Sequence, residues 1–402
     1  MNLTALLNFY PLEALGSFWS DFMSTSSGSD TLFRLYGFPV LHSASPPFHN
    51  LIFDLQGQGR HYSTFSTSKI IPDMLKELHS DVFGGCSVTM PIKGAIIPYL
   101  DDIEPESKAT GAVNTIVKVP AQPESGGIKL IGTNTDILGV KNALLRSLRL
   151  QHSGENISSQ DRYPPGAGSA VVYGGGATSR SAIYALSSMG LHPIYVVNRD
   201  ADEVKQVQNI FPELVSRGSL IHLRTPQEVE EHVVQSNPIL MVVGAIPAVK
   251  PVTMEERMVY TVASHIFNMP YDPPSSYNPS GVTGLLPLPS KRLFLEMAYK
   301  PRITPMLKVA AAHGWEPIEG IEAMIEQGYA QQRMWAAGNA SATIGSDPSI
   351  LGTFIERMAR DLVLSMEDVI VKEVEVDLAA EMQAAPLVET PSPTFRILPT
   401  RK

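Results

Sequence analysis

A strand, a glycine cluster and a helix follow one another near the middle of the chain, and this order restricts the fold more than any other feature. Residues 170–173 form a short apolar strand, 174–177 hold the glycine cluster, and a helix is expected over about 179–189. Gly190 ends that helix, and a second strand follows at 193–197. Such a unit pairs two parallel strands across a helix, so the sequence predicts an α/β fold.

The glycine cluster also predicts a ligand. It consists of Gly174, Gly175, Gly176 and Ala177. Glycine lets the backbone turn sharply and approach a pyrophosphate, and the helix that follows offers unpaired N–H groups and a positive dipole end. The spacing G-x-G-x-x-G is met only in part, because Ser179 stands where the third glycine is expected. On this motif alone, a tight turn without a ligand stays open beside a dinucleotide site.

The residues after the second strand bear on the choice of cofactor. Asn198, Arg199 and Asp200 stand at roughly the distance at which such folds contact the adenosine ribose. An arginine favours the 2′-phosphate of NADP, whereas an acid favours the free 2′-hydroxyl of NAD. Asp202 and Glu203 add two carboxylates, which would repel a 2′-phosphate. The turn therefore predicts a preference for NAD with residual use of NADP, although Arg199 also fits a solvated surface charge.

Four polar segments lie where strands are expected to end. They read HSASP at 42–46, SVTMPIK at 87–93, GAVNT at 111–115 and GTNTD at 132–136. Hydroxyls, amides, one lysine and one aspartate together suit a small ligand that carries several hydroxyls and a carboxylate. Each segment alone also has a structural explanation, because serine caps helices, asparagine fits turns and lysine is commonly solvated.

Taken together and in order, these segments resemble the shikimate/quinate dehydrogenase family over residues 33–338, and fungal members in particular. The matching motifs are V-T-x-P-x-K at 88–93, G-A-V-N-T at 111–115, N-T-D at 134–136, Y-x-P at 299–301 and E-Q-G-x-x-Q at 326–331. The resemblance implies an oxidoreductase that reversibly oxidises a ring hydroxyl of quinate or shikimate to the 3-dehydro ketone with a nicotinamide cofactor.

The resemblance also assigns residues to roles. Lys93 would be the acid/base and Asp136 its partner, since a desolvated lysine can transfer a proton near neutral pH. The expected substrate contacts are Ser43, Ser45, Thr89, Asn114, Tyr299 and Gln327. The expected cofactor contacts are Gly174, Gly175, Gly176, Ala177, Asn198, Arg199 and Asp200. Ser45 precedes Pro46 and is also expected to cap a helix.

Three positions depart from the family pattern. Ser87 stands where the family commonly has asparagine, and Glu296 where it often has aspartate. Residues 244–247 read GAIP in place of an Asn-Ala-Thr run. We expect the first two changes to alter a hydrogen bond and the third to alter the wall beside the nicotinamide.

The resemblance implies an α/β fold of two domains, an α/β substrate domain and a Rossmann-like dinucleotide-binding domain, with the active site in the cleft between them. Residues 32–148, completed by 296–345, would form the substrate domain, and 168–295 the dinucleotide-binding domain. A flexible extension is expected at 1–31 and a flexible tail at 365–402.

Composition narrows the remaining possibilities. The net charge is −9 and basic residues are not clustered, which disfavours nucleic acid or an anionic membrane as a partner. Cys86 is the one cysteine, so an internal disulfide is excluded, and a cytoplasmic location is expected. No apolar run is long enough for a membrane helix, and no H-x-x-x-H or C-x-x-C spacing predicts a metal site.

Three functional alternatives stay open. We favour quinate catabolism, because fungi usually house the biosynthetic activity in a large fusion protein. The second is a biosynthetic, NADP-dependent shikimate dehydrogenase. The third belongs to another class, a non-catalytic ligand sensor of the quinate pathway, which need not keep both Lys93 and Asp136. The sequence predicts no oligomeric state.

Overall fold

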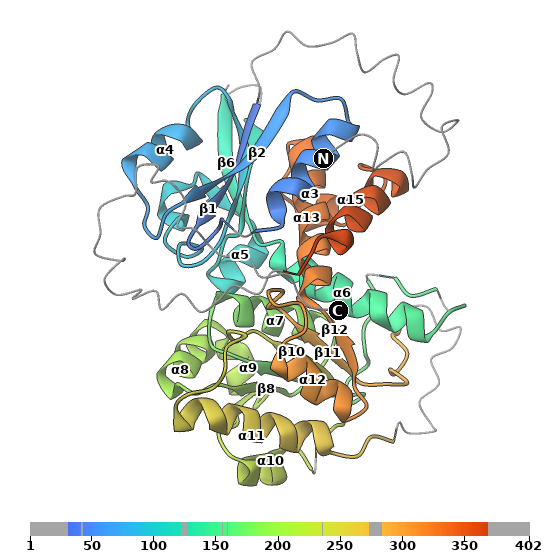
Figure 1. Ribbon diagram of the computed structural model, residues 1–402. Coiled ribbons are helices and arrows are strands. Elements are labelled where there is room, and N and C mark those ends of the chain that lie inside the picture. The colour runs from blue at the N-terminus through green and yellow to red at the C-terminus, as the bar shows by residue number, and fades with distance from the viewer. Residues whose placement is uncertain are drawn as a thin grey trace.

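The computed structural model describes residues 31–41, 43–121, 127–154, 156–158, 160–234, 236–272 and 284–368. Within these residues the chain forms two six-stranded sheets, each flanked by helices, which lie one above the other in Figure 1. In these ranges no helix is both long and apolar enough to cross a membrane. The extension and tail expected from the sequence lie almost entirely outside the described residues, as does residue 42 of the first polar segment.

The first sheet is mixed. In spatial order its strands are β2 (Arg60–Ser66), β1 (Thr31–Gly37), β3 (Phe83–Val88), β5 (Thr115–Pro120), β6 (Ile128–Thr133) and β4 (Asp102–Ile103). β1 is parallel to β2 and β3, whereas β5 is antiparallel to both β3 and β6. The ends of β1, β3 and β6 and the start of β5 therefore meet at one edge of the sheet. This topology brings the four polar segments of the sequence together.

Helices cover both faces of this sheet. They are α3 (Ser45–Leu55), α4 (Pro72–Leu78), α5 (Pro105–Thr110), α13 (Gly320–Ala337), α14 (Ala342–Gly345) and α15 (Thr353–Ser365), with a 3₁₀ turn η2 (Ile97–Tyr99). Met74 of α4 packs with Tyr36 of β1 on one face, and Trp335 of α13 packs with Phe33 on the other. Most of α13 is buried, including the side of the helix formed by Ile321, Met324, Ile325, Gly328, Gln332 and Trp335.

The second sheet is entirely parallel. Its strands are, in spatial order, β12 (Glu316–Ile318), β11 (Leu293–Glu296), β10 (Ile239–Gly244), β7 (Ser169–Tyr173), β8 (Ile194–Val197) and β9 (Leu220–His222). Read from β9, the strands follow the chain order 3-2-1-4-5-6, which is the order of the doubly wound dinucleotide-binding fold. The predicted Rossmann-like domain is therefore confirmed, with the glycine cluster after its first strand.

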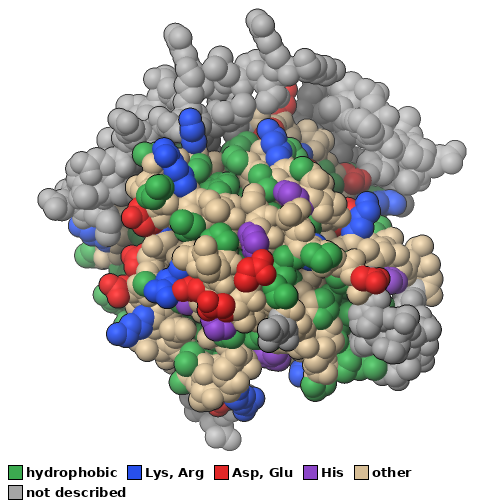
Figure 2. All heavy atoms as spheres, turned by 90° about the horizontal axis from the view of Figure 1, so that it is seen from below, with side chains coloured by type: hydrophobic (Ala, Val, Ile, Leu, Met, Phe, Trp, Pro, Cys, Tyr) green, Lys and Arg blue, Asp and Glu red, His purple; other side chains and the backbone are tan. Residues whose placement is uncertain are grey.

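Helices lie on both faces of the second sheet. They are α7 (Ala177–Ser188), α8 (Ala201–Ile210), α9 (Pro212–Ser216), α10 (Pro226–His232), α11 (Met254–Asn268) and α12 (Pro305–Ala312). The long helix α6 (Asp136–Gln151) leads from the first sheet to the second and packs against both α7 and α13. On the face seen from below, basic and acidic side chains lie side by side (Figure 2).

The boundary expected at residue 296 divides elements that the structure keeps together. β12 pairs with β11 as the sixth strand of the second sheet. Met306 and Leu307 of α12 lie in the same apolar core as Phe294 of β11. The chain therefore returns to the first sheet only with α13. A strand as short as β12 gives a weak sequence signal, because three residues show no clear alternation.

Candidate active site

Lys93 and Asp136 meet at the edge of the first sheet where the polar segments converge. Lys93 follows the turn after β3, and Asp136 is the first residue of α6. The Lys93 Nζ donates to Asp136 Oδ2 at 2.5 Å, and each side chain is 12% exposed. A carboxylate this close fixes the direction of the lysine side chain, while the exposed part leaves its amine open to a ligand.

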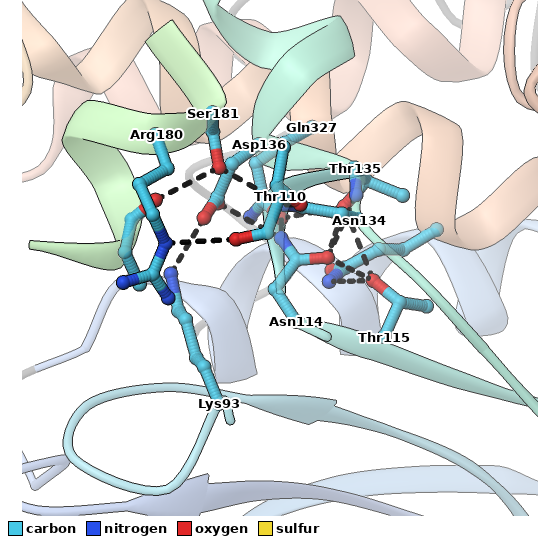
Figure 3. A network of polar contacts seen from close by, with 12 residues as sticks. Lys93, Thr110, Asn114, Thr115, Asn134, Thr135, Asp136, Arg180, Ser181 and Gln327 are labelled. Atoms are coloured by element: carbon cyan, nitrogen blue, oxygen red, sulfur yellow. Dashed lines mark hydrogen bonds and ion pairs between the residues drawn. The ribbon is translucent and has the colours of Figure 1, made fainter. Parts of the chain in front are cut away.

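The second oxygen of Asp136 is held as well (Figure 3). Asn114 Nδ2 donates to Asp136 Oδ1 at 2.8 Å, and Asn114 Oδ1 accepts the backbone N–H of Thr135 at 2.7 Å. Gln327 of α13 accepts from Asn114 Nδ2 at 3.2 Å and from Thr135 Oγ1 at 3.1 Å. Both carboxylate oxygens thus have a partner from a different element, so the plane of the carboxylate is fixed.

A serine pair and a tyrosine lie on another side of the site. The backbone N–H of Ser45 donates to Ser43 Oγ at 3.2 Å. Burial raises the pKa of Tyr299, and contacts of its hydroxyl with Ser43 and the Ala44 backbone partly oppose that rise. The expectation that Ser45 caps a helix is wrong. α3 begins at Ser45 itself, and Ala44 occupies the cap position without a side-chain bond.

One cavity of about 500 Å³ joins these groups to the second sheet. All the catalytic and substrate-contacting residues predicted from the sequence line it: Ser43, Ser45, Thr89, Lys93, Asn114, Asp136, Tyr299 and Gln327. The opposite wall contains Thr178 of α7 and the apolar residues Ala245, Ile246 and Pro247, which follow β10. The cavity therefore has a polar wall from one domain and a mostly apolar wall from the other.

Gln331 belongs to the polar wall, but sequence reasoning did not assign it to the site. Gln331 Nε2 donates to Thr115 Oγ1 at 2.9 Å, and Gln331 Oε1 accepts from Ser87 Oγ at 3.1 Å. Ser87 in turn accepts from the Tyr62 hydroxyl at 2.8 Å. Gln331 lies one helical turn after Gln327, so both face the cavity. The four-residue spacing between the two glutamines is visible in the motif at 326–331, and it could have assigned Gln331 to the site from the sequence alone.

The glycine cluster leaves room for a phosphate. Gly174 has φ of 116°, and a Cβ there would lie 2.6 Å from the Ala245 oxygen, so only glycine fits. Around the Cβ position of Gly176, which is the N-cap of α7, no atom of the described residues lies within 4 Å apart from its chain neighbours and the backbone of its own helix. Ser179 Oγ is buried beside Gly174 and has no hydrogen-bond partner among the described residues. The open helix N-terminus and the unpaired hydroxyl both fit the pyrophosphate of a dinucleotide.

The turn after β8 differs from the expectation in one respect. Asp200 Oδ1 accepts the backbone N–H groups of Asp202 at 2.8 Å and Glu203 at 3.3 Å, so it caps α8. Glu203 Oε2 accepts from Asn198 Nδ2 at 2.8 Å and lies against Gly175 instead. Arg199 forms an ion pair with Glu256. Aspartate is a favoured N-cap, so this local role competes with ribose binding.

The remaining departures from the family pattern fall in two places. Residues 245–247 form the cavity wall, as expected. Glu296 is buried behind the cavity, where Thr304 Oγ1 donates to its Oε2 at 3.0 Å and the Ala298 N–H to its Oε1 at 3.3 Å. Burial raises the pKa of Glu296 to about 7. Glu296 therefore does not line the cavity, and its bond to the Ala298 N–H holds the backbone next to Tyr299.

The comparison with known proteins agrees with this geometry. A model of the shikimate dehydrogenase substrate binding domain matches residues 35–116. The structure of dehydroquinate dehydratase and shikimate dehydrogenase from S. pombe AroM is 27% identical, with a TM-score of 0.59, covering 83% of this chain. The match covers 52% of that chain, so this protein spans about half the length of the solved fungal chain.

Two bacterial enzymes share the fold along their whole length. Quinate dehydrogenase from Corynebacterium glutamicum in complex with NAD is 20% identical, with a TM-score of 0.55 over 84% of this chain and 100% of that one. Shikimate 5-dehydrogenase from Thermus thermophilus in complex with NADP(H) and shikimate is 24% identical, with a TM-score of 0.52 over 82% and 99%. The matched substrate binding domain, the ordered motifs and the shared two-domain fold make the chain similar to the shikimate and quinate dehydrogenases.

Proposed function

We propose that this protein oxidises a ring hydroxyl of quinate or shikimate to the 3-dehydro ketone, with quinate and NAD as the favoured pair. The observation that carries the proposal is the contact between Lys93 and Asp136 inside a cavity lined by both domains. An isolated surface lysine would have no such partner and no such enclosure. NAD or NADP, when bound, supplies the hydride acceptor.

The protein's own residues would manage the proton and the orientation of the substrate. Lys93 Nζ takes the proton from the reacting hydroxyl, and Asp136 holds the resulting ammonium in place. Ser43, Ser45 and Tyr299 hold the carboxylate, and Thr89, Asn114 and Gln327 hold the other hydroxyls. The apolar wall at 245–247 keeps water from the reacting carbon.

The cofactor contacts follow from the dinucleotide-binding fold. The backbone of Gly174, Gly175, Gly176 and Ala177 would hold the pyrophosphate at the N-terminus of α7. Asn198 and Arg199 would lie beside the adenosine ribose, and Asp200 would act there mainly by ordering the start of α8. The carboxylates at this turn support NAD, since a free 2′-hydroxyl avoids the repulsion that a 2′-phosphate meets.

A second candidate function is a biosynthetic shikimate dehydrogenase that uses NADP. Arg199 favours it, because a guanidinium binds phosphate through two parallel hydrogen bonds. The Thermus thermophilus relative was solved with NADP(H) and shikimate, whereas the Corynebacterium glutamicum relative was solved with NAD.

One set of assays separates these functions. Purified protein is given quinate or shikimate, each with NAD or NADP, and kcat/KM is measured for the four pairs. The highest value for quinate with NAD supports our proposal, and the highest value for shikimate with NADP supports the second candidate. Binding of quinate without turnover of any pair would contradict both and identify a ligand sensor.

A further inference from the structure

Glu256 lies in the first turn of α11, and its two carboxylate oxygens have different partners. Oε2 accepts the backbone N–H groups of Val252 at 2.7 Å and Thr253 at 3.1 Å. These bonds complete a capping box in which Thr253 is the N-cap. Oε1 accepts a hydrogen bond from Arg199 Nη1. Capping requires one oxygen only, so the ion pair with Arg199 is separate from the local helix motif.

Arg199 stands on the wall shared by two hollows beside the β8–α8 turn. The larger, of about 440 Å³, is also lined by Asp200, Asp202 and Glu255. The smaller, of about 270 Å³, is also lined by Asn198 and Met258. In a dinucleotide-binding fold the adenosine half of the cofactor lies at this turn. The Arg199 side chain is 55% exposed, so a ligand in either hollow can reach it.

We propose that Glu256, from outside this turn, is a specificity-determining residue that disfavours a 2′-phosphate on the adenosine ribose. The inference rests on the proposed function, because it takes these hollows as the cofactor's adenosine site. Arg199 binds a phosphate well only with its guanidinium edge available, and Glu256 already accepts from one of its terminal nitrogens. An approaching 2′-phosphate either displaces this carboxylate or stays beside it, and like charges then repel.

The other arginine of the hollows does not replace Arg199. Arg224 donates to Glu228 Oε1 from Nε at 3.0 Å and from Nη2 at 2.6 Å. Both arginines that line the hollows therefore have a carboxylate partner in the described structure. The carboxylates of Asp200, Asp202 and Glu255 add further negative charge. A ribose with free hydroxyls meets none of this repulsion, so the arrangement selects by charge.

The substitution Glu256→Gln tests the ion pair while it keeps the helix cap. Glutamine serves in a capping box because its amide oxygen accepts the same backbone N–H groups, but its NH₂ group cannot accept from Arg199. Calorimetry would compare adenosine 2′,5′-bisphosphate with adenosine 5′-monophosphate, which differ only in the 2′-phosphate. We expect the affinity for the bisphosphate to rise about tenfold, the scale of one charge-assisted contact, and the affinity for the monophosphate to stay unchanged.

Two further variants make the result specific. Glu230→Gln removes the same charge from a pair with His265, in the last turn of α11, and should change neither affinity. In an Arg199→Ala background, Glu256→Gln should bring a clearly smaller gain, because the arginine that it releases is absent and only the repulsion between like charges is relieved. Melting temperatures of all variants show whether the fold is kept.

Each other outcome is decisive. Equal bisphosphate affinity in the wild type and Glu256→Gln overturns the inference, and so does a gain that is equally large without Arg199 or that Glu230→Gln reproduces. Turnover with NAD together with an unchanged bisphosphate affinity overturns this inference alone. Failure of the wild type to bind either nucleotide, with no turnover, overturns the proposed function as well.

Discussion

Arg180, in the first turn of α7, donates from Nε to the backbone oxygen of Thr110 at 2.7 Å and from Nη2 to that of Gly111 at 3.3 Å. These carbonyls lie at the end of α5 and at the start of the segment 111–115 that carries Asn114. Ser181 accepts from Asn134 Nδ2 at 3.0 Å on the next position of the same helix (Figure 3). The helix that follows the glycine cluster is thereby tied to the two loops that position the Lys93–Asp136 pair.

Removal of the Arg180 contacts should therefore reduce turnover from a distance. Arg180→Met keeps the apolar stem but loses both bonds, so the segment at 111–115 should become more mobile and hold Asp136 less well. We expect kcat to fall about tenfold, on the order of 1.4 kcal/mol. Hydrogen exchange at 111–115 should rise, and Arg217→Met, which alters an exposed pair with Glu213, should change neither quantity. Normal turnover in Arg180→Met would contradict the coupling.

Substitution of Lys93 should abolish most turnover and leave the fold intact. Lys93→Ala removes the proposed proton acceptor, while Asn114 still holds Asp136. The expected loss in kcat is roughly 10² to 10⁴, with a much smaller change in substrate binding. Lys93→Arg is the matched variant, because arginine can keep the ion pair but does not release a proton near neutral pH. Recovery of turnover in Lys93→Arg would show that charge alone matters and would contradict the acid/base role.

The sequence predicted those parts of the site that are formed by consecutive residues of the chain. The strand, the glycine cluster and the helix at 170–189 are consecutive, and one topology follows from them. The polar segments are short, but each follows or begins a strand of one sheet, so their meeting point follows from the resemblance. Gln331 was recoverable for the same reason, since it shares a helix face with Gln327.

The parts that sequence reasoning missed depend on pairings between distant residues or on single positions at a helix end. Arg199 and Glu256 lie in different elements, and neither sequence neighbourhood points to the other. Ser45 was assigned a cap that lies one residue earlier, at Ala44. The sequence assignment of Asp200 to the ribose left out its bonds to the first N–H groups of α8, a role that an aspartate before a helix readily takes. The N-cap of a helix is a single residue, so an error of one position in the predicted start of the helix assigns the capping role to the wrong residue.

Glu296 predicts a specific pH dependence of stability. Its pKa is raised from 4.5 to about 7 by burial, so the folded state binds this proton more tightly than the unfolded state does. Its contribution to stability is therefore complete below about pH 4.5 and is lost as the pH rises through about 7. Glu296→Gln carries no charge at any pH and should lack this loss, so it should gain at most about 3 kcal/mol over the wild type between these limits.

The measurement for Glu296 is the free energy of unfolding at about pH 5 and about pH 8 for the wild type and Glu296→Gln. Glu316→Gln is the matched control, because it removes a partly exposed carboxylate from the neighbouring strand β12. It should follow the wild type at both pH values. If the curve of Glu296→Gln also runs parallel to that of the wild type, the carboxyl does not titrate in this window and the prediction is wrong.

Asp200 allows the charge of the cofactor turn to be separated from the cap of α8. Asp200→Ser and Asp200→Ala both remove a carboxylate that lines the hollow beside Arg199. Both should therefore shift the ratio of kcat/KM values toward NADP by a similar amount, about 1 kcal/mol for one weakened repulsion. Serine is also a good N-cap whereas alanine is not, so only the alanine variant should lose stability, again about 1 kcal/mol.

A shift in cofactor preference confined to the alanine variant would mean that disorder at the start of α8, and not charge, sets the preference. A wild-type enzyme that strongly prefers NADP would mean that Arg199 binds the 2′-phosphate despite its pairing with Glu256, and that these carboxylates act only on the helix.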